Sequence, residues 1–507
     1  MAASGASQLG QTTTSILIAV FILGVFAFYK RTKRPDGFPP GPSSLPIFGS
    51  FLGFGFNKSP HQLFRELHKK YGDIYSLNFA GQNTVLLNSA EVVKEAYVKH
   101  AVEFSGRGRA YAVGLLTEGF KDIIFSDGPQ WKYQRKLAHS VFRQFTQRKQ
   151  MERLVHDVTP KIASVLDAFG DKPFAPKWTV CNIVYNILAT FTLGKKYELN
   201  DPEIMTYIDL RNTVMYQVGN GQPADYLPIL KYIPIPSVLK FKRLLKSFHR
   251  FFYDEFNKHR ERFDPENVGD LFDLLILKQS EEKEAGEDQA GKLTDTHIVQ
   301  IVMDLLIAGT DTAIHTLHWA IAAMTEHPEI QEKVAMEIYE VVGRDRLPSI
   351  DDKGTLPYTE ATILEVFRFG SVVPIGIPHS VMADTSLCGY KIPKGTSVMI
   401  NHLALHYNPR DWAEPNKFKP EHFLKDNGEL LTNLPESFLP FSCGRRSCLG
   451  EDFAKKEIFL LFTWLFSRYT FYKVPGKEMT SLLTATSNSA FNHQPRNELQ
   501  VCVKRRF

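Results

Sequence analysis

The sequence predicts a mainly α-helical domain with small β-sheets, preceded by an N-terminal transmembrane helix. Three patterns support this fold class: helical periodicity over residues 154–263 and 294–326, strand alternation over residues 74–87, and an uninterrupted apolar run over residues 16–29. The chain has 507 residues, of which 43% are hydrophobic, so it is long enough to bury a large core.

The apolar run is followed by basic residues at positions 30, 31, 33 and 34. A cleaved signal peptide would carry its basic residues before the run, so we favour an uncleaved anchor whose C-terminal side lies in the cytosol. The prolines between residues 35 and 42 stiffen the chain that follows. We therefore predict an anchor at residues 1–30, a basic and proline-rich hinge at 31–55, and one domain at 56–507.

Within that domain the elements follow in order along the chain. An amphipathic helix is expected at about residues 62–70, then a hairpin over 74–87 that turns at 81–83, then a helix that begins near residue 127. Residues 280–292 are charged and lack apolar periodicity, which indicates an exposed loop. Further helices are expected from residue 294 or 295 to about 326, and from about residue 357 onward.

The net charge of +5 is small for 507 residues and falls short of the concentrated basic face that nucleic-acid binding requires. It better suits an anionic membrane surface or an acidic protein partner. The cysteines show no paired spacing, which argues against a disulfide framework and a zinc site and favours a reducing compartment. They are Cys181, Cys388, Cys443, Cys448 and Cys502.

A loop near the C-terminus brings one of these cysteines to the start of a helix. Its pattern is FxxGxRxCxG, formed by Phe441, Gly444, Arg446, Cys448 and Gly450. Unpaired N–H groups at a helix start favour a thiolate, glycines permit close approaches, and arginine suits a carboxylate. A lone cysteine would usually be a buried core residue. Five matched positions favour a metal ligand instead.

This loop resembles the haem-ligand signature of the cytochrome P-450 superfamily, animal microsomal type. The resemblance implies the cytochrome P-450 fold, haem b as cofactor, and Cys448 as the thiolate ligand of the haem iron. It also implies that haem propionates are bound by Trp131, Arg135, His379 and Arg446, with Phe441 shielding the sulfur and Gly450 allowing close approach. Trp131 and Arg135 support this from the residues themselves, since positions i and i+4 share one helix face. Cys443 fits no position of the signature.

The long helix at 294–326 is interrupted by polar residues at Ala308-Gly309-Thr310-Asp311-Thr312. A threonine that hydrogen-bonds back to its own helix is the simpler interpretation. The family resemblance implies instead that Gly309 makes room for dioxygen, while Asp311 and Thr312 form a catalytic proton relay. Glu365 and Arg368 match the buried structural pair of the family. His422 stands where an arginine usually completes that lock, so the lock depends on protonation or on a neutral hydrogen bond.

Several segments resemble the branch that contains steroid 17-alpha-hydroxylase and the aryl-hydrocarbon monooxygenases, namely residues 223–230, 356–361 and 377–380. We expect a haem-thiolate monooxygenase that hydroxylates a lipophilic ring substrate, with a steroid favoured and a planar aromatic xenobiotic as the alternative. A haem-thiolate isomerase or lyase and a non-catalytic lipid binder are the remaining hypotheses. Substrate contacts are expected from Ala308, Val373, the loop 111–125 and the tail 483–486.

The resemblance further implies electrons from NADPH, relayed by a flavoprotein reductase, with cytochrome b5 as a further donor. Basic residues around the helix at Trp131 and around the cysteine loop suit an acidic reductase surface. They are Lys132, Lys136, Arg143, Arg148, Lys149, Arg445, Lys455 and Lys456. The expected location is the endoplasmic reticulum membrane, with a single-pass N-terminal anchor and the catalytic domain in the cytosol.

Overall fold

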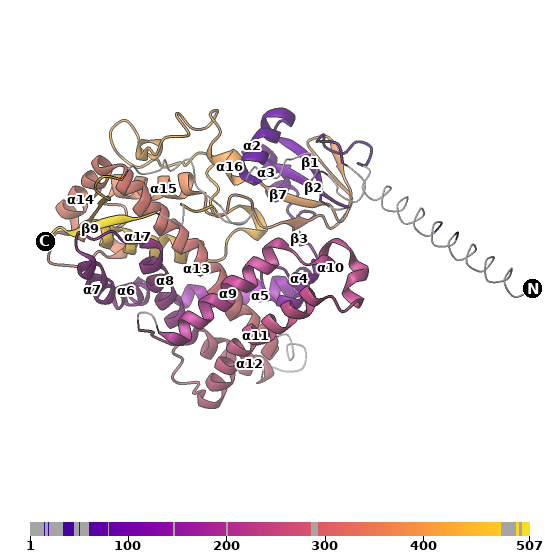
Figure 1. Cartoon of the computed structure of the whole chain (residues 1–507), viewed down its shortest axis with the longest axis horizontal. Helices are drawn as coiled ribbons and strands as arrows, with labels where there is room; N and C mark the ends of the chain where they lie inside the picture. Colours follow the sequence, from indigo (N-terminus) through magenta and orange to yellow (C-terminus); the bar gives the residue numbers. More distant parts are fainter. Residues whose placement is uncertain are drawn as a thin grey trace, which may run out of the picture. The chain divides into compact units, whose positions relative to one another are not determined.

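The structure is a computed structural model of the whole chain (Figure 1). It describes residues 34–44, 60–79, 81–145, 148–198, 201–284, 293–477, 493–495 and 499–507, together with positions 15, 19 and 50. The expected anchor at 16–29 lies outside the described residues except for Ala19, and so do the tail 483–486 and most of the hinge beyond residue 44. The described elements are mainly helices, with three small sheets, which confirms that part of the fold prediction.

The chain divides into two compact units, and the smaller one comprises Met1–Gly108 and Ile377–Ala404. Its main sheet has the order β1-β2-β7-β4-β3, in which β2 and β7 are parallel and the other pairs antiparallel. A separate hairpin pairs β5 with β6. The elements are α2 (Pro60–Tyr71), β1 (Ile74–Phe79), β2 (Gln82–Leu87), α3 (Ala90–Lys94), the π-helical turn η2 (Glu95–Lys99), β3 (Gly106–Arg107), β4 (His379–Ser380), β5 (Thr385–Leu387), β6 (Tyr390–Ile392) and β7 (Ser397–Ile400).

The proline-rich segment is tied to this unit by hydrogen bonds. Ser76 in β1 donates from its hydroxyl to the carbonyl of Pro39 and from its backbone N–H to that of Pro40, both at 2.7 Å. A Cβ on Gly41 would lie 1.9 Å from the Ser76 carbonyl oxygen, so only glycine fits there. The described part of the predicted hinge is therefore an ordered segment packed on β1.

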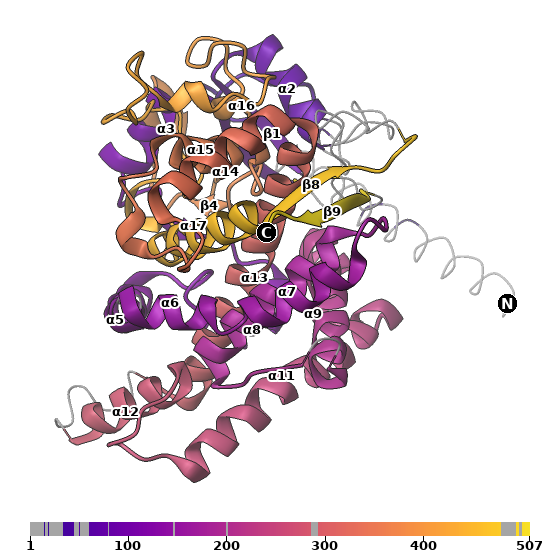
Figure 2. The same cartoon turned by 90° about the vertical axis from the view of Figure 1, so that its left-hand side faces the viewer.

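The larger unit comprises Arg109–Gly376 and Leu405–Phe507 and holds most of the helices. Its C-terminal strands form a two-stranded antiparallel sheet, drawn in yellow in Figure 2. Helix α16 (His402–His406) crosses the boundary between the units. The other elements are α4 (Tyr111–Leu116), α5 (Gly128–Phe145), α6 (Arg148–His156), α7 (Thr159–Phe169), α8 (Pro176–Leu193), α9 (Pro202–Asn220), α10 (Pro223–Tyr226), η3 (Pro228–Tyr232), α11 (Pro236–Arg262), α12 (Leu271–Glu284), α13 (Asp295–Glu326), α14 (Pro328–Val342), η4 (Ile350–Asp352), α15 (Pro357–Gly370), η5 (Pro420–Phe423), η6 (Gly444–Arg446), α17 (Glu451–Arg468), β8 (Tyr469–Lys473) and β9 (Val501–Arg505).

Helix α13 is the central element of the larger unit. It packs against α8, α11, α12, α14, α15 and α17, and Figure 1 shows it running through this unit. Thr294 caps it by accepting a hydrogen bond from the backbone N–H of His297, as the sequence predicted. Among the described residues it is the one helix long and apolar enough to cross a membrane, but 67% of its most apolar window is buried in the fold. It is therefore a core helix.

Most element predictions are confirmed within about two residues, because their patterns were long and periodic. The helix at Trp131 begins at Gly128, the long helix spans Asp295–Glu326, and the later helix begins at Pro357. The exposed loop predicted at 280–292 is wrong at its start, since α12 continues to Glu284. Charged residues at the end of that helix have no apolar stripe to reveal it, and residues 285–292 lie outside the description.

A buried ion pair joins the end of α11 to the segment before α12. His259 Nδ1 lies 2.7 Å from the Glu255 carbonyl oxygen, and its Nε2 lies 2.8 Å from both the Asp270 carboxylate and an Arg262 guanidinium nitrogen. Burial alone would lower the pKa of His259, but Asp270 and the Glu255 carbonyl hold it above its usual value. The pair therefore stabilises the fold only while the imidazole is charged.

The raised pKa predicts a pH-dependent stability. The contribution of His259 should be complete below the unfolded-state pKa of about 6.5 and should disappear as pH rises through the higher folded-state pKa. Urea unfolding midpoints of the wild type should accordingly fall from mildly acidic to alkaline pH. Asp270→Asn should remove the part of this decrease that comes from His259. Identical pH profiles of the unfolding midpoint for both proteins would contradict the raised pKa of His259.

Candidate functional site

The cysteine loop, residues 441–450, contains η6 and leads into α17 in the larger unit. Gly444 adopts a left-handed φ of 73°, which turns the chain sharply before Arg446. The backbone N–H of Cys448 then donates to the Phe441 carbonyl oxygen at 2.9 Å, closing the loop three residues before α17 begins. The loop therefore presents a single thiol at a helix start, as the sequence predicted.

Cys448 combines two properties that are rarely found together. Its side chain is exposed, yet burial raises the pKa of its thiol, as expected of a group that faces an internal space. The backbone N–H of Gly450 and the Arg135 guanidinium lower the pKa of this thiol, but by less than burial raises it. The expectation that the helix start alone yields a thiolate is therefore wrong for the free chain. A cation at the sulfur would be needed to complete the deprotonation.

Three predicted cofactor-binding residues come together beside this loop. The Arg446 guanidinium lies 3.7 Å from the centroid of the Trp131 ring, and that of Arg135 lies 5.9 Å away. Arg135 donates to the Ser447 carbonyl oxygen (2.6 Å) and Arg446 to that of Ser126 (2.7 Å). Trp131 is 4% exposed, and its Nε1 has no hydrogen-bond partner among the described residues.

This cluster fits an anionic cofactor edge next to the thiol. An indole N–H buried without an acceptor is costly, and two guanidinium groups offer further donors that match carboxylates. The residues present therefore fit a haem with a thiolate ligand and buried propionates. The roles of Phe441 and Gly450 stay predictions: the Phe441 ring packs edge-on against Phe367 at 5.3 Å, and a Cβ on Gly450 would meet no atom within 4 Å.

His379 belongs to the smaller unit, and its contacts are described there. It is 6% exposed, its ring stacks on Tyr97 with centroids 4.0 Å apart, and its Nδ1 lies 2.7 Å from the Phe104 carbonyl oxygen. Arg107 donates to the carbonyl oxygens of Ile377 and Pro378 just before it. The ring is thus held in one orientation, and its propionate role stays a prediction.

Helix α13 has a solvent-accessible face at residues 308–312, where polar residues interrupt its apolar sequence. Ala308 is exposed and Thr312, one turn later, is half-buried, although the helix is otherwise largely buried. The Thr312 hydroxyl donates to the Ala308 carbonyl oxygen at 2.8 Å, which is the back-bonded state that the residue pattern alone favoured. Val373, the other residue expected to contact substrate, is also half-buried, in the segment after α15.

Gly309 has a different structural role from the one expected. A Cβ at this position would lie 3.1 Å from Cδ1 of Leu188 in α8, so the glycine lets α8 and α13 approach closely. Because glycine has no side chain, α8 can lie close to α13 at this position. The sequence interpretation had expected this space to hold dioxygen instead. Helix packing explains the glycine without a ligand.

Asp311 is ion-paired with a residue that the sequence interpretation missed. Arg211, 2% exposed on α9, contacts the Asp311 carboxylate, and it also donates to the Asn212 side chain at 2.9 Å. Burial alone would raise the pKa of Asp311, but Arg211 and His315 beside it hold it below its usual value. The carboxylate is therefore ionised. The sequence did hold a sign of this ion pair, because Arg211 falls on the apolar face of α9. That face is formed by Ile204, Tyr207, Ile208 and Val214.

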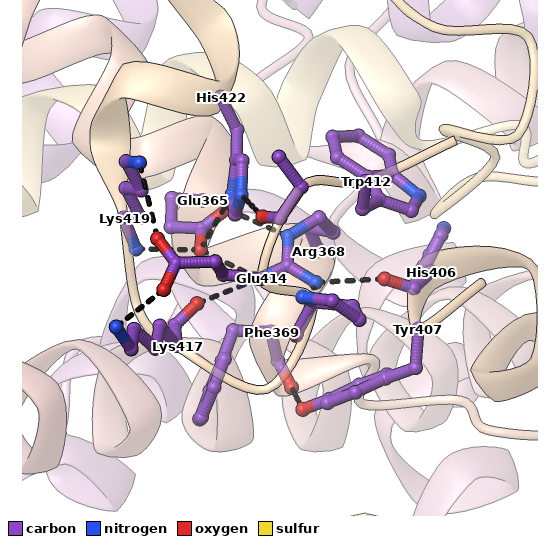
Figure 3. Close-up of polar contacts among 12 residues, drawn as sticks. Glu365, Arg368, Phe369, His406, Tyr407, Trp412, Glu414, Lys417, Lys419 and His422 are labelled. Atoms are coloured by element: carbon purple, nitrogen blue, oxygen red, sulfur yellow. Dashed lines mark hydrogen bonds and ion pairs between the residues drawn. The ribbon is translucent and has the colours of Figure 1, made fainter. Parts of the chain in front are cut away.

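The predicted structural pair on α15 is buried and hydrogen-bonded, as Figure 3 shows. Arg368 donates from Nε and Nη2 to the two carboxylate oxygens of Glu365 at 2.7 and 2.6 Å, and both side chains are fully buried. The remaining Arg368 donors reach carbonyl oxygens of His406, Pro415 and Lys417 at 2.7, 2.9 and 3.1 Å. One guanidinium therefore joins α15 to three points of the segment 406–417.

His422 lies against this pair. Its Nδ1 is 3.3 Å from both carboxylate oxygens of Glu365, and its Nε2 faces the Ala413 carbonyl oxygen (Figure 3). Because a carboxylate and a carbonyl accept hydrogen bonds, we predict the protonated imidazolium from the two possibilities left open by the sequence.

This charge assignment can be tested by substitution. We expect His422→Leu to lower the free energy of unfolding by about 1–3 kcal/mol, because Glu365 loses a charged donor in a buried site. His422→Arg should retain most of the stability because it restores a cation. Urea unfolding compares the two variants, and equal midpoints for leucine and arginine would show that His422 carries no charge in the lock.

Comparisons with known proteins agree with this geometry. The sequence model of the family described as Cytochrome P450 matches residues 39–501. Cytochrome P450 1A1 of Mesocricetus auratus is 33% identical over 93% of this chain and 92% of its own length. Steroid 17-alpha-hydroxylase/17,20 lyase of Ictalurus punctatus is 33% identical over 91% and 89%, and Cytochrome P450 1A1 of Homo sapiens is 33% identical over 91% and 93%.

Proposed function

The chain belongs to the cytochrome P450 family, and on that premise we propose that it hydroxylates a lipophilic ring compound, with a steroid as the first candidate substrate. It is a monooxygenase of the oxidoreductase class that binds haem b and receives electrons originating from NADPH. The observation that carries the proposal is the solvent-accessible thiol of Cys448, whose loop carries Arg446 and contacts Arg135 beside Trp131.

In this proposal each site residue has one task. Cys448 ligates the iron, while Trp131, Arg135, His379 and Arg446 hold the propionates. Thiolate-bound haem supplies oxygen activation when it is present. Ala308 and Val373 contact the substrate.

Asp311 and Thr312 manage protons on the open face of α13. Because Asp311 is an ionised carboxylate beside Arg211, it takes up a proton that solvent supplies as hydronium, which leaves as water, before a proton passes on toward Thr312. Thr312 must then release its hydrogen bond to the Ala308 carbonyl to take part, which a rotation about χ1 achieves.

A threonine variant tests this relay. Thr312→Ala should bind haem like the wild type but should divert electrons from product to hydrogen peroxide, because the hydroxyl that orients the proton is lost. Peroxide formed per NADPH consumed measures the effect, and Ser447→Ala in the cysteine loop is the matched hydroxyl control. Unchanged coupling in Thr312→Ala would contradict the relay.

Two substrate classes are candidates for this site. The steroid 17-alpha-hydroxylase/17,20 lyase relative and the cytochrome P450 1A1 relatives are 33% identical to this chain, so identity does not separate them. The alternative substrate is therefore a planar aromatic xenobiotic. A spectral binding screen that compares progestins with polycyclic aromatics decides between the two, since a compound bound beside the haem would shift the haem absorption. A shift with aromatics alone would overturn the steroid proposal.

We also propose attachment to the endoplasmic reticulum membrane. Besides the apolar run at 16–29, exposed large apolar side chains are concentrated between residues 216 and 239, which supports contact with a lipid surface. They are Tyr216, Tyr226, Leu227, Ile229, Tyr232, Ile233 and Leu239. Protease added to sealed microsomes should digest the domain, whereas complete protection would refute a cytosolic orientation.

The proposed electron donor is a flavoprotein reductase, with cytochrome b5 as a second donor. Lys132, Lys136 and Arg143 are exposed on α5 and suit an acidic partner. Lys455 and Lys456 are instead paired with Glu451 and Asp452 at 2.6 and 2.7 Å. The structure thus favours α5 over α17 as the basic docking element.

A further inference from the structure

Three successive residues between α4 and α5 have left-handed backbone conformations. Their φ angles are 48° at Glu118, 88° at Gly119 and 64° at Phe120, and we call these three residues the 118–120 turn. Glycine adopts such a conformation freely, whereas it strains the backbone of a glutamate or a phenylalanine. A strained turn persists only where the surrounding structure enforces it, so the contacts of this turn show what holds it in place.

The Glu118 side chain joins the 118–120 turn to two helices. Its carboxylate accepts hydrogen bonds from the Tyr253 hydroxyl of α11 at 2.9 Å and from the Gln300 amide of α13 at 3.0 Å. Gln300 is fully buried, and its amide nitrogen also lies 3.4 Å from the Leu116 carbonyl oxygen. Burial, together with the Glu118 carboxylate, raises the pKa of Tyr253 to about 12, so its hydroxyl keeps its proton. Two donors from different helices therefore meet at one carboxylate.

Backbone groups on either side of the turn are bound to the same two helices. On α11, Nε2 of His249 lies 2.7 Å from the carbonyl oxygen of the last residue of α4. On α13, the Asp304 carboxylate accepts hydrogen bonds from the N–H groups of Ile123 and Ile124 at 2.8 and 3.2 Å. The chain is thus attached to α11 before the turn and to α13 after it, while the Glu118 carboxylate contacts both helices.

The ring of Phe120 folds back over α4 and makes the turn continuous with that helix. A Cβ on Gly114 would lie 3.2 Å from this ring, so the glycine allows the close contact. The Gly119 backbone N–H donates to the Gly114 carbonyl oxygen at 2.8 Å. The Arg109 guanidinium lies 4.3 Å from the centroid of the Phe120 ring and pairs with Asp127 at 2.6 Å. A displacement of the turn would therefore displace α4 with it.

We propose that Glu118 is a positioning residue for the reaction, which fixes the segment 115–125 against α11 and α13 so that substrate is held in one orientation. The inference rests on the proposed function, because substrate contacts are expected from this segment. Leu115, Ile124 and Phe125 are half-buried within it and are the candidates for those contacts. The left-handed turn directs the Glu118 carboxylate between the two helices, which accounts for a glutamate where glycine would be unstrained.

The first test needs neither substrate nor turnover. In the haem-loaded protein, Glu118→Ala should exchange the backbone amide hydrogens of residues 112–124 about tenfold faster than the wild type, as measured by mass spectrometry. The matched control is Glu198→Ala, which removes an exposed carboxylate paired with Lys161 at 2.7 Å and should leave this exchange unchanged. Equal exchange in Glu118→Ala and the wild type would overturn the proposal whatever reaction the enzyme catalyses. Faster exchange in a protein whose wild type forms no product would uphold the attachment and count against the proposed function alone.

The second test uses the reaction itself. Glu118→Ala should raise KM about tenfold and spread oxidation over more positions of the ring compound, while kcat changes by less than about twofold. A merely structural role would lower the amount of active enzyme and leave the product ratio unchanged, and that result would contradict the proposal. Glu118→Gln, whose amide oxygen still accepts a hydrogen bond, should stay closer to the wild type. Tyr253→Phe should shift the product ratio in the same direction and add nothing to Glu118→Ala.

A glycine variant separates the strained backbone from the carboxylate contact. Glu118→Gly relieves the left-handed conformation, so its urea unfolding midpoint should lie above that of Glu118→Ala. It therefore also serves if Glu118→Ala fails to fold. Its product ratio should nevertheless match that of Glu118→Ala, because both variants lack the carboxylate. If Glu118→Gly instead gives the wild-type product ratio, the turn alone positions the segment and the role of Glu118 is refuted.

Discussion

Glu365→Ala is expected to lower the free energy of unfolding by about 3–5 kcal/mol and to prevent stable haem retention. The substitution leaves the fully buried Arg368 guanidinium without its carboxylate, and breaking one partner of such a pair leaves an uncompensated charge in the interior. His422 loses the acceptor of its Nδ1 proton at the same time, and so does the backbone N–H of Lys419, which donates to Glu365 at 2.8 Å. Urea unfolding and the haem content of the purified protein measure both effects.

The matched control lies in the same segment. Glu414→Ala removes an exposed carboxylate that pairs with Lys417 and Lys419, and surface pairs of this kind contribute little (Figure 3). Its unfolding midpoint should therefore match the wild type. If Glu365→Ala and Glu414→Ala shifted the midpoint equally, burial of the lock would not be the source of its stability.

Cys448→Ser should abolish the thiolate character of the bound haem while the fold persists. A hydroxyl is a poor ligand for haem iron compared with a thiolate, and electron donation from the sulfur is what favours O–O cleavage. The reduced protein under carbon monoxide should lose the absorption band typical of thiolate-bound haem, and NADPH-dependent product formation should fall to background. Circular dichroism should report unchanged helix content.

Cys443→Ser is the control. This cysteine lies five positions earlier in the same loop, at the N-cap of η6, and so it is not at the start of α17. It should keep the thiolate band and the activity. A thiolate band that survives in Cys448→Ser and disappears in Cys443→Ser would reassign the ligand.

The ion pair between Arg211 and Asp311 changes the chemistry expected on α13. The motif around Asp311 suggested an acid that donates protons, whereas Arg211 keeps it ionised, so it must first be loaded with a proton.

Local patterns determined much of this protein from the sequence alone. The helix bounds at Gly128, Asp295 and Pro357, the hairpin at 74–87 and the cysteine loop were all predictable, because each depends on residues that are close in sequence. The tertiary structure decided the rest: the partner of Asp311, the neighbour of Gly309, the contacts of His422 and the raised pKa of the Cys448 thiol. Each of these depends on burial or on atoms brought together from distant segments, and periodicity carries no information about which distant segments will meet.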